Sequence, residues 1–423
     1  MILRYSSIQK TLWLLCGLTL PLFSVSYFRL NIEAMGLKLA LPFFIIIFIG
    51  TFFLLFIKQY KISYSILSNK ILFFYIWIFF IWQLFECLRA FDIFLGAREI
   101  IRLIFGIITF FIIYLCFPKD KKFLSHFLTV VIWASSILMG FLIYKYLFIF
   151  KSPFLGSELN YQTRESRNQL TQYFLYIFPY LFFYTFYIRK RIYKIIPFVL
   201  ILFGLIYSGS RGTIIALVIG FLITFIIAIY NKIRILSIFK VIAGVILCAS
   251  IFLFMIRPIE RVILNKELEV FDRFYALYRP DAVANIGTYD LRSELIKTAW
   301  DDFQKDPILG IGSANFIFMN NGDRLPTHND YLAIAVEDGL VGLILFLIIL
   351  GIIYKRILTA KIKPRGNDQH YYLGMLWSFN SIIIFLNFMN CYPTVLFWMN
   401  LGLSLVILEI LHRDQNVAVA YSP

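Results

Sequence analysis

One histidine lies where a polar loop meets a long apolar stretch. His328 belongs to the segment LPTHNDYLAIAVEDGLVGLILFL, residues 325–347. Thr327 is a residue type that begins helices, and Asp330 follows it at the spacing of a near capping box, so we expect a helix capped by Thr327. His328 would then lie in the first turn, where the helix dipole disfavours the imidazolium and keeps the ring a neutral base.

Arginines are the second residue type that could do chemistry. Arg211 lies between two glycines in YSGSRGTI, and Arg164, Arg167 and Asn168 lie in LNYQTRESRNQLTQY. Guanidinium groups bind phosphate in a bidentate manner, and a cluster of them at a membrane edge suits a lipid pyrophosphate head group.

Each of these residues also has a purely structural interpretation. His328 could be an interfacial residue with satisfied hydrogen bonds, and Arg211 could anchor a turn at the lipid head groups. Arg292 could belong to a surface charge pattern with Glu294. The residue types alone leave these alternatives open.

The composition predicts that these residues are positioned by an integral membrane protein. The chain is 61% hydrophobic and only 15% charged. Its apolar stretches are each near the length that a helix needs to cross roughly 30 Å of hydrocarbon, and we predict an all-α fold with about 12 transmembrane helices. The predicted spans are 11–28, 39–57, 71–86, 99–117, 125–150, 170–188, 193–208, 212–230, 236–256, 332–354, 371–390 and 394–412. The first span is followed by no cleavage site, so we do not expect a signal peptide.

The distribution of basic residues among the loops predicts which side of the protein faces the cytoplasm. The net charge is +16, and with a cytoplasmic N-terminus about half of the 40 basic residues fall in the inner loops with about four acids. The basic balance is therefore a topology signal and gives no reason to expect nucleic acid. His328 is then the only outward histidine of four.

One outer loop, residues 257–327, is too long to be a simple connector. We divide the chain into spans 1–9 (residues 1–256), a periplasmic loop (257–331), and spans 10–12 with a short tail (332–423). Within the loop, DLRSELIKTAWDDFQKDP has the spacing of an amphipathic helix ended by Pro307. Gly310 and Gly312 follow and allow a close turn.

Charged and small residues come next within the apolar stretch. Glu337 and Asp338 are too costly to face lipid, so either the helix projects above the bilayer or they line a wet cavity. Gly339 and Gly342 would let another backbone approach closely.

Three segments in this order, GSRGTIIALVIGFLI, DPILGIGSANF and HNDYLAIAVEDGLVGLILFL, resemble the O-antigen ligase/polymerase superfamily of bacterial inner membranes. The third is similar to the ligase pattern of His, then Asn, Gln or Ser, nine residues, and Gly-x-x-Gly. His328, Asn329, Gly339 and Gly342 occupy those positions. The matched segments cover residues 209–347, and the topology, similar to GT-C glycosyltransferases, extends the resemblance to most of the chain.

The resemblance implies a glycosyltransferase that moves finished O-antigen from undecaprenyl pyrophosphate to the lipid A–core oligosaccharide, completing lipopolysaccharide. The reaction would occur at the periplasmic face of the Gram-negative inner membrane, with one-step inversion at the donor sugar. The resemblance further implies that Arg211 and Arg292 bind the pyrophosphate and that His328 is essential, as base or as binding group. The weaker substrate-binding candidates are Asn329, Arg164, Arg167 and Asn168.

We predict neither a metal nor a cofactor, because the sequence has no Asp-x-Asp and no outward His, Cys and carboxylate set with metal-ligand spacing. An O-antigen polymerase would use a second lipid-linked chain as acceptor, and a protein O-oligosaccharyltransferase would use a protein. Polymerases often carry Arg-x10-Gly in their outer loops, a pattern that none of the outward arginines above begins. A non-catalytic lipid or polysaccharide transporter would need ionisable residues deep in several spans, for which the chief candidates are Glu86 and Lys145.

Overall fold

The computed structural model describes most of the chain. The described residues are 2–24, 29–32, 37–40, 45–50, 69–149, 167–187, 195–208, 210–231, 233, 288–316, 318–320, 323–359, 368–389 and 391–420. The predicted span 236–256, most of the span 39–57 and residues 257–287 of the long loop lie outside them.

Helices make up most of the described structure. Apolar stretches become helices because a helix satisfies its own backbone N–H and C=O groups, which lipid cannot do. In chain order the helices are α1 Ile2–Thr19, α4 Lys70–Leu88, α5 Ile93–Cys116, α6 Lys121–Tyr144, α7 Arg167–Tyr187, α8 Ile195–Tyr207, α9 Arg211–Tyr230, α12 Thr288–Lys305, α13 Asp330–Thr359, α14 Gln369–Phe385 and α15 Val395–Ala420. A 3-10 turn, Leu20–Ser24, follows α1, and a π-helical turn, Lys145–Ile149, follows α6.

Six of the described helical segments are long and apolar enough to cross a membrane. They are Lys70–Leu88, Ile93–Cys116, Lys121–Ile149, Arg211–Tyr230, Asp330–Thr359 and Val395–Arg413. A multi-pass membrane protein is therefore the architecture, while the number of twelve spans stays a prediction. Two short antiparallel hairpins were not predicted: β1 Arg29–Ile32 pairs with β2 Leu37–Ala40, and β3 Phe318–Asn320 pairs with β4 Asp323–Leu325.

The first helix starts earlier than the sequence predicts, at Ile2 instead of near residue 11. Lys10 forms an ion pair with Asp120 at 2.8 Å, and the indole N–H of Trp13 donates to the carbonyl oxygen of Cys116 at 3.1 Å. These contacts hold the middle of α1 against the end of α5 and the start of α6. Pro21, which has no backbone N–H, lies just beyond the end of the helix.

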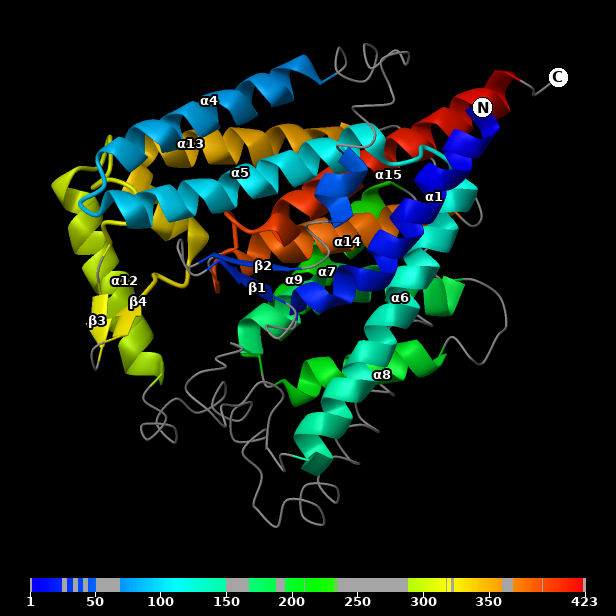
Figure 1. Cartoon of the computed structure of the whole chain (residues 1–423), viewed down its shortest axis with the longest axis horizontal. Helices are drawn as coiled ribbons and strands as arrows, with labels where there is room; N and C mark the ends of the chain where they lie inside the picture. The colour runs from blue at the N-terminus through cyan, green and yellow to red at the C-terminus, as the bar shows by residue number, and fades with distance from the viewer. Residues whose placement is uncertain are drawn as a thin grey trace.

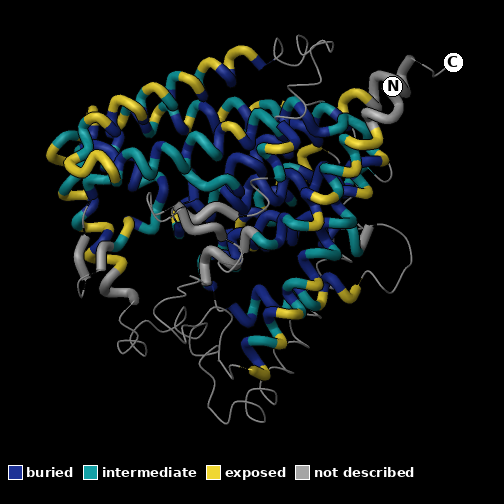
Figure 2. The backbone as a smooth tube through the Cα atoms, in the orientation of Figure 1, coloured by how far each residue is buried: buried dark blue, intermediate teal, exposed yellow. Residues whose placement is uncertain are grey.

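The helices form a bundle with an enclosed centre (Figures 1 and 2). α14 packs against α7, α9 and α15, α15 also packs against α5, and α4 packs against both α5 and α13. The outward side of α4 exposes large apolar residues at helical spacing, as expected of a face that meets lipid. These residues are Ile71, Phe74, Trp77, Ile81 and Leu88.

The two ends of the bundle differ. α12 lies across one end, beside β3 and β4, whereas the start of α1 and the end of α15 lie at the other (Figure 1). At that second end, basic residues pair with acidic ones. The pairs are Lys10–Asp120, Lys121–Asp368 and Lys119–Glu409. Five of these residues lie on the side predicted to be cytoplasmic, and Glu409 lies near the cytoplasmic end of the last predicted span. α12 belongs to the side predicted to be periplasmic.

Candidate functional site

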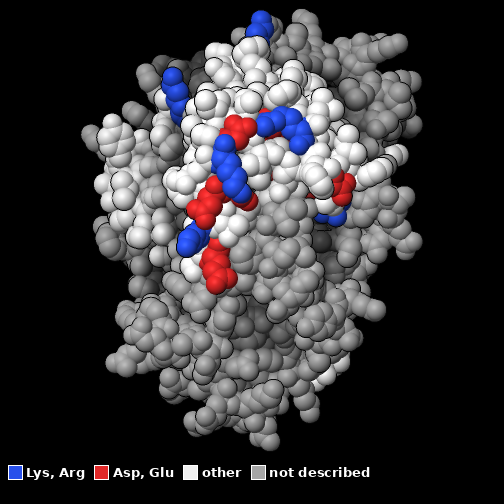
Figure 3. All heavy atoms as spheres, turned by 90° about the vertical axis from the view of Figure 1, so that its left-hand side faces the viewer, with Lys and Arg blue, Asp and Glu red and all other residues white. Residues whose placement is uncertain are grey.

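α12 is the amphipathic helix that the loop sequence predicts. Leu295 and Ala299 are buried against Phe316 and against Val336 of α13. The opposite side of the helix carries charges of both signs, which alternate along this end of the molecule (Figure 3). The exposed charged residues of α12 are Arg292, Glu294, Lys297, Asp301 and Lys305.

Residues 306–316, which we call the glycine loop, leave the end of α12 in a close turn. Gly310 and Gly312 have φ values of 82° and 98°, which other residue types rarely adopt. A Cβ atom on Gly310 would lie 2.5 Å from the carbonyl oxygen of Glu337, and one on Gly312 would lie 2.7 Å from that of Arg89. Both glycines are therefore needed for this turn, as predicted.

The glycine loop passes through a break in α13. Gly339 interrupts the helix with φ 68° and ψ −173°. The amides of Ile311 and Gly312 donate to the carbonyl oxygens of Val336 and Glu337, at 2.9 and 3.0 Å. Beyond the break, the amide of Leu340 donates at 2.9 Å to a carbonyl oxygen at the start of the loop, that of Pro307. The loop thus satisfies backbone groups that the break exposes, which an apolar environment would otherwise penalise.

Asp338, one of the two acids beside this break, is enclosed by the protein. Asp338 is 1% exposed, and the side-chain amide of Gln83 donates to its Oδ2 at 2.5 Å. The indole N–H of Trp82 donates to the carbonyl oxygen of Asp338 at 3.0 Å. A Cβ on Gly342 would lie 3.2 Å from the same indole nitrogen, so α4 approaches α13 closely here.

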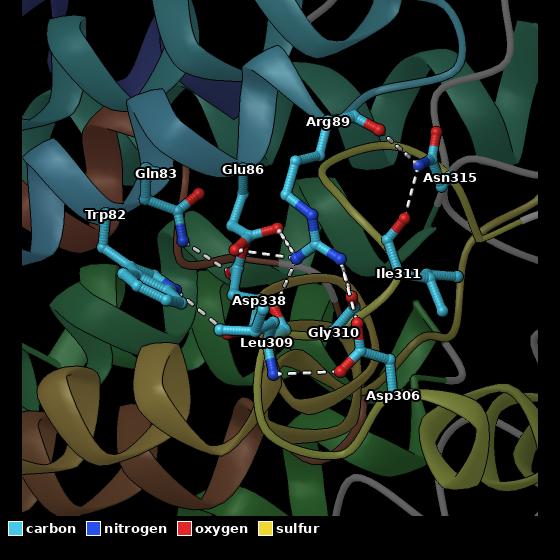
Figure 4. Close-up of polar contacts among 10 residues, drawn as sticks. All are labelled: Trp82, Gln83, Glu86, Arg89, Asp306, Leu309, Gly310, Ile311, Asn315 and Asp338. Atoms are coloured by element: carbon cyan, nitrogen blue, oxygen red, sulfur yellow. Dashed lines mark hydrogen bonds and ion pairs between the residues drawn. The ribbon is translucent and has the colours of Figure 1, made fainter.

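Arg89, in the short connection between α4 and α5, contacts the glycine loop from the other side (Figure 4). Its guanidinium forms ion pairs with Glu86 and Asp306, each at 2.9 Å, and donates to the carbonyl oxygen of Gly310 at 2.9 Å. The side-chain amide of Asn315 donates to the carbonyl oxygen of Arg89 at 3.1 Å. The sequence does not identify Arg89 as a contact of this loop, because Asp306 and Gly310 lie 217 and 221 residues further along the chain.

The start of α13 differs from the prediction. The residue that caps the helix is Asn329 and not Thr327. The Oδ1 of Asn329 accepts a hydrogen bond from the amide of Leu332 at 3.1 Å. Thr327 supports this cap, because its hydroxyl donates to the carbonyl oxygen of Asn329 at 3.0 Å. Asparagine is the stronger capping residue of the two. His328 consequently precedes the helix, with a φ of 53° that non-glycine residues seldom adopt.

The surroundings of His328 keep its ring neutral. Burial lowers the pKa of His328 to about 4, and the positive charge of Arg292 lowers it further. The neutral form agrees with the prediction, although burial and Arg292 take the place of the helix dipole as its causes. Nδ1 is buried without a hydrogen-bond partner among the described residues, whereas Nε2 is not enclosed in this way. The guanidinium of Arg292 therefore lies near enough to His328 for its charge to act on the ring.

Asp330 joins the start of α13 to the connection between α14 and α15, residues 386–394. Its amide donates to the carbonyl oxygen of Leu386 at 2.7 Å, and its Oδ2 accepts from the amides of Cys391 and Tyr392 at 2.7 and 3.1 Å. The buried Asp330 thus fixes the turn that holds His328 against this connection.

Arg211 begins α9 near the same connection. Gly212 packs so closely that a Cβ there would lie 2.8 Å from the Cβ of Phe388. Below it, the hydroxyls of Ser210 and Thr213 lie 2.8 Å apart, and that of Thr213 donates to Thr171 of α7 at 2.8 Å. No ion pair or hydrogen bond joins the Arg211 guanidinium to the described parts of the chain. The connection of residues 386–394 therefore contacts both the start of α9, next to Arg211, and the start of α13, next to His328.

Comparison with known protein families finds a match over the part of the chain that contains Arg211, Arg292 and His328. Residues 196–347 match the family model described as O-antigen ligase. This match supports membership of the chain in the O-antigen ligase superfamily. The matched region runs from α8 into α13 and includes Arg211, Arg292 and His328. No curated protein matches the chain.

The remaining predicted site residues are Arg164, Arg167, Asn168 and Asn329, and the structure describes them only in part. Arg164 lies outside the described residues. Arg167 and Asn168 are the first two residues of α7, whose side chains the structure does not describe. Thr171, one turn further, reaches the start of α9, so this end of α7 belongs to the same region as Arg211. The Oδ1 of Asn329 is used by its cap, which leaves its N–H₂ group for any contact with substrate.

The arrangement suits a reaction between an anion and a hydroxyl. A neutral imidazole with one accessible nitrogen can accept a proton, and a guanidinium beside it can bind a negatively charged group. The O-antigen ligase superfamily acts on lipid-linked polysaccharide by glycosyl transfer. Proton acceptance by an imidazole and anion binding by a guanidinium are both consistent with that chemistry.

Proposed function

We propose that the protein is an O-antigen ligase that transfers O-antigen polysaccharide from undecaprenyl pyrophosphate to the lipid A–core oligosaccharide. The reaction takes place on the periplasmic face of the inner membrane, the side of α12 and of the turn that holds His328. The observation that carries the proposal is the pairing of a neutral, partly accessible His328 with Arg292, inside the region that matches the ligase family.

In the proposed reaction, a hydroxyl oxygen of the acceptor forms a bond with the anomeric carbon of the donor sugar. The bond from that carbon to the pyrophosphate oxygen breaks, and the hydroxyl proton moves to Nε2 of His328. Arg211 and Arg292 stabilise the charge that develops on the leaving pyrophosphate. Because attack and departure occur on opposite sides of the carbon, the anomeric configuration inverts.

The low pKa of His328 also has a role in this scheme. A ring with a pKa of about 4 is neutral at physiological pH but is a weak base. When the donor pyrophosphate binds Arg292, its negative charge offsets the guanidinium charge that depresses the pKa of His328. The base therefore becomes stronger when the donor is in place.

The two guanidinium groups supply positive charge at the leaving group, so the proposed reaction is independent of divalent metal. Asn329, through its free N–H₂ group, and Arg164, Arg167 and Asn168, near the start of α7, are proposed as additional contacts to the pyrophosphate or the acceptor.

A complementation experiment tests the proposal. The wild type, His328→Ala and Arg211→Ala are expressed in a ligase-null Gram-negative host that makes O-antigen and a matching core, and the lipopolysaccharide is separated on a gel. His412→Ala and Arg413→Ala serve as controls, because both residues are exposed at the opposite end of α15. We expect the wild type and both controls to restore the ladder on lipid A–core, and the two site variants to reach the membrane without restoring it.

Other outcomes would assign a different acceptor. If the wild type leaves polymer on its lipid carrier but lengthens single-unit chains in a polymerase-null host, the protein is a polymerase. If glycan instead appears on membrane or periplasmic proteins, it is a protein O-oligosaccharyltransferase. If donor and acceptor both persist unchanged at the periplasmic face, the ligase proposal is wrong.

A further inference from the structure

Arg89 has no part in the reaction proposed above, yet it contacts the segment that leads from Arg292 to the break in α13. We propose that Arg89 is a positioning residue: through Asp306 it fixes the end of α12, and so holds Arg292 beside His328. Its importance for catalysis rests on the proposed function, whereas the positioning itself can be tested without any substrate.

The contacts of Arg89 connect three parts of the chain. Nη1 lies 2.9 Å from Oε2 of Glu86 and donates to the carbonyl oxygen of Leu309 at 3.3 Å. Nη2 donates to Oδ2 of Asp306 and to the carbonyl oxygen of Gly310, both at 2.9 Å. The Glu86 side chain is fully buried, while that of Arg89 is 28% exposed. A guanidinium that is oriented by a buried carboxylate is held in one geometry, unlike an exposed surface ion pair.

The position of Asp306 makes this contact a constraint on the whole helix. α12 ends at Lys305, so no flexible segment separates the helix from the ion pair. Arg292 lies about 14 residues earlier, which is roughly 20 Å along a helix. A rotation of about 10° at Asp306 would therefore move Arg292 by roughly 3.5 Å over that length.

α12 is also held along its length by apolar packing. Leu295 and Ala299 are buried against Phe316 and Val336, and partly buried apolar residues pack around them: Phe303, Ile311, Leu325 and Leu332. Backbone hydrogen bonds fix the middle of the glycine loop to α13, but they begin at Pro307, beyond Asp306. The ion pair is thus a side-chain contact at the junction of the helix and the loop.

The pKa of His328 reports where Arg292 lies. Arg292 is the charged residue of α12 that lowers it, and Asp330 is the acid nearest in sequence, with one carboxylate oxygen bound by the amides of Cys391 and Tyr392. If α12 shifts and Arg292 moves away, the pKa of His328 should rise towards its usual value. A general loss of stability at a distant ion pair would not change it in this way.

The experiment is a histidine titration by NMR on the full-length protein in nanodiscs, with isotope-labelled histidine. The chain has only four histidines, and His328→Gln assigns the relevant signal. The test variants are Asp306→Asn, which keeps the Arg89–Glu86 pair and the side-chain oxygen that accepts from the Leu309 amide, and Arg89→Lys. Arg89→Ala is avoided because it would leave Glu86 buried without its cation.

Two further variants calibrate the result. Arg292→Gln removes the charge itself. Asp120→Asn is the matched control, because Asp120 also caps a turn and pairs with a cation, Lys10 at 2.8 Å, with a side-chain exposure of 43% against 38% for Asp306. We expect the pKa of His328 to rise by about 0.5 or more in Asp306→Asn, Arg89→Lys and Arg292→Gln, and to stay unchanged in Asp120→Asn.

The proposal is overturned if Asp306→Asn and Arg89→Lys titrate like the wild type while Arg292→Gln does not. It is also overturned if Arg292→Gln has no effect, or if Asp120→Asn shifts His328 as much as Asp306→Asn does. Because no substrate is used, a failure of the ligase proposal in the complementation experiment leaves this result intact.

Discussion

Gly339→Ala should destabilise the protein strongly, because the position tolerates neither the backbone conformation nor the size of alanine. The combination of φ 68° and ψ −173° belongs almost exclusively to glycine, and forcing another residue into it costs about 1–3 kcal/mol. A Cβ atom would also lie 2.5 Å from the carbonyl carbon of Ile308 and closer still to its oxygen. Relieving such an overlap costs about 1–3 kcal/mol more.

The combined loss, about 2–6 kcal/mol, is large beside the 5–15 kcal/mol by which folded proteins are typically stable. The assay is thermal unfolding of the purified protein in detergent, together with limited proteolysis of the glycine loop. We expect a lower Tm and faster cleavage between residues 306 and 316, since the loop can no longer pass through the break.

Gly351→Ala is the matched control within the same helix. The structure places no described atom within 4 Å of a Cβ at this position, so alanine should stabilise the helix by about 0.5–1 kcal/mol. The reasoning is refuted if Gly339→Ala unfolds at the wild-type temperature with an intact loop, or if Gly351→Ala is equally destabilised.

Further predictions concern the start of α13 and the dependence on metal. Asn329→Ala removes the cap and should lower the free energy of unfolding by about 1 kcal/mol, whereas Asn329→Asp keeps an acceptor; equal Tm values for all three proteins would contradict this. Because the folded pKa of His328 is lowered to about 4, kcat/KM should stay high down to about pH 5 and fall as the pH drops through 4, and Arg292→Gln should move this limb to higher pH. By the same linkage, the contribution of His328 to stability is fully present above its unfolded pKa of about 6.5 and is lost as the pH falls towards 4, which unfolding measured across that range would reveal. Ligase activity should survive treatment with a chelator, and an absolute need for added Mg²⁺ or Mn²⁺ would refute the metal-independent mechanism.

The sequence predicts those features of the fold that depend on neighbouring residues. The apolar stretches become helices because lipid leaves the backbone few alternatives, and α12 follows from its own amphipathic spacing. The turn at Gly310 and Gly312 follows equally from local chemistry. The sequence predicts Thr327 as the cap of α13, whereas the cap is Asn329. Both are capping residue types two positions apart, and a small difference in preference decides between them.

What the sequence does not predict are contacts between distant segments. The break at Gly339 lies within a continuous apolar pattern, and its cause is the glycine loop, which hydropathy cannot show. Arg89 has the appearance of a residue that merely ends a span, until Asp306 is found beside it. The site shows the same division: His328 and Arg211 are recognisable by motif, but the nearness of Arg292 to His328 emerges only from the packing of α12.

The break in α13 also indicates where His328 lies relative to the hydrocarbon core of the membrane. The part of α13 beyond Gly339, residues 340–359, is about 20 residues or roughly 30 Å long, which alone equals the thickness of the hydrocarbon core. A bilayer matched to that part leaves residues 330–338, and His328 before them, outside the hydrocarbon. There, the imidazole would meet sugar rings that project from the membrane, while the prenyl chain of a lipid carrier stays within it.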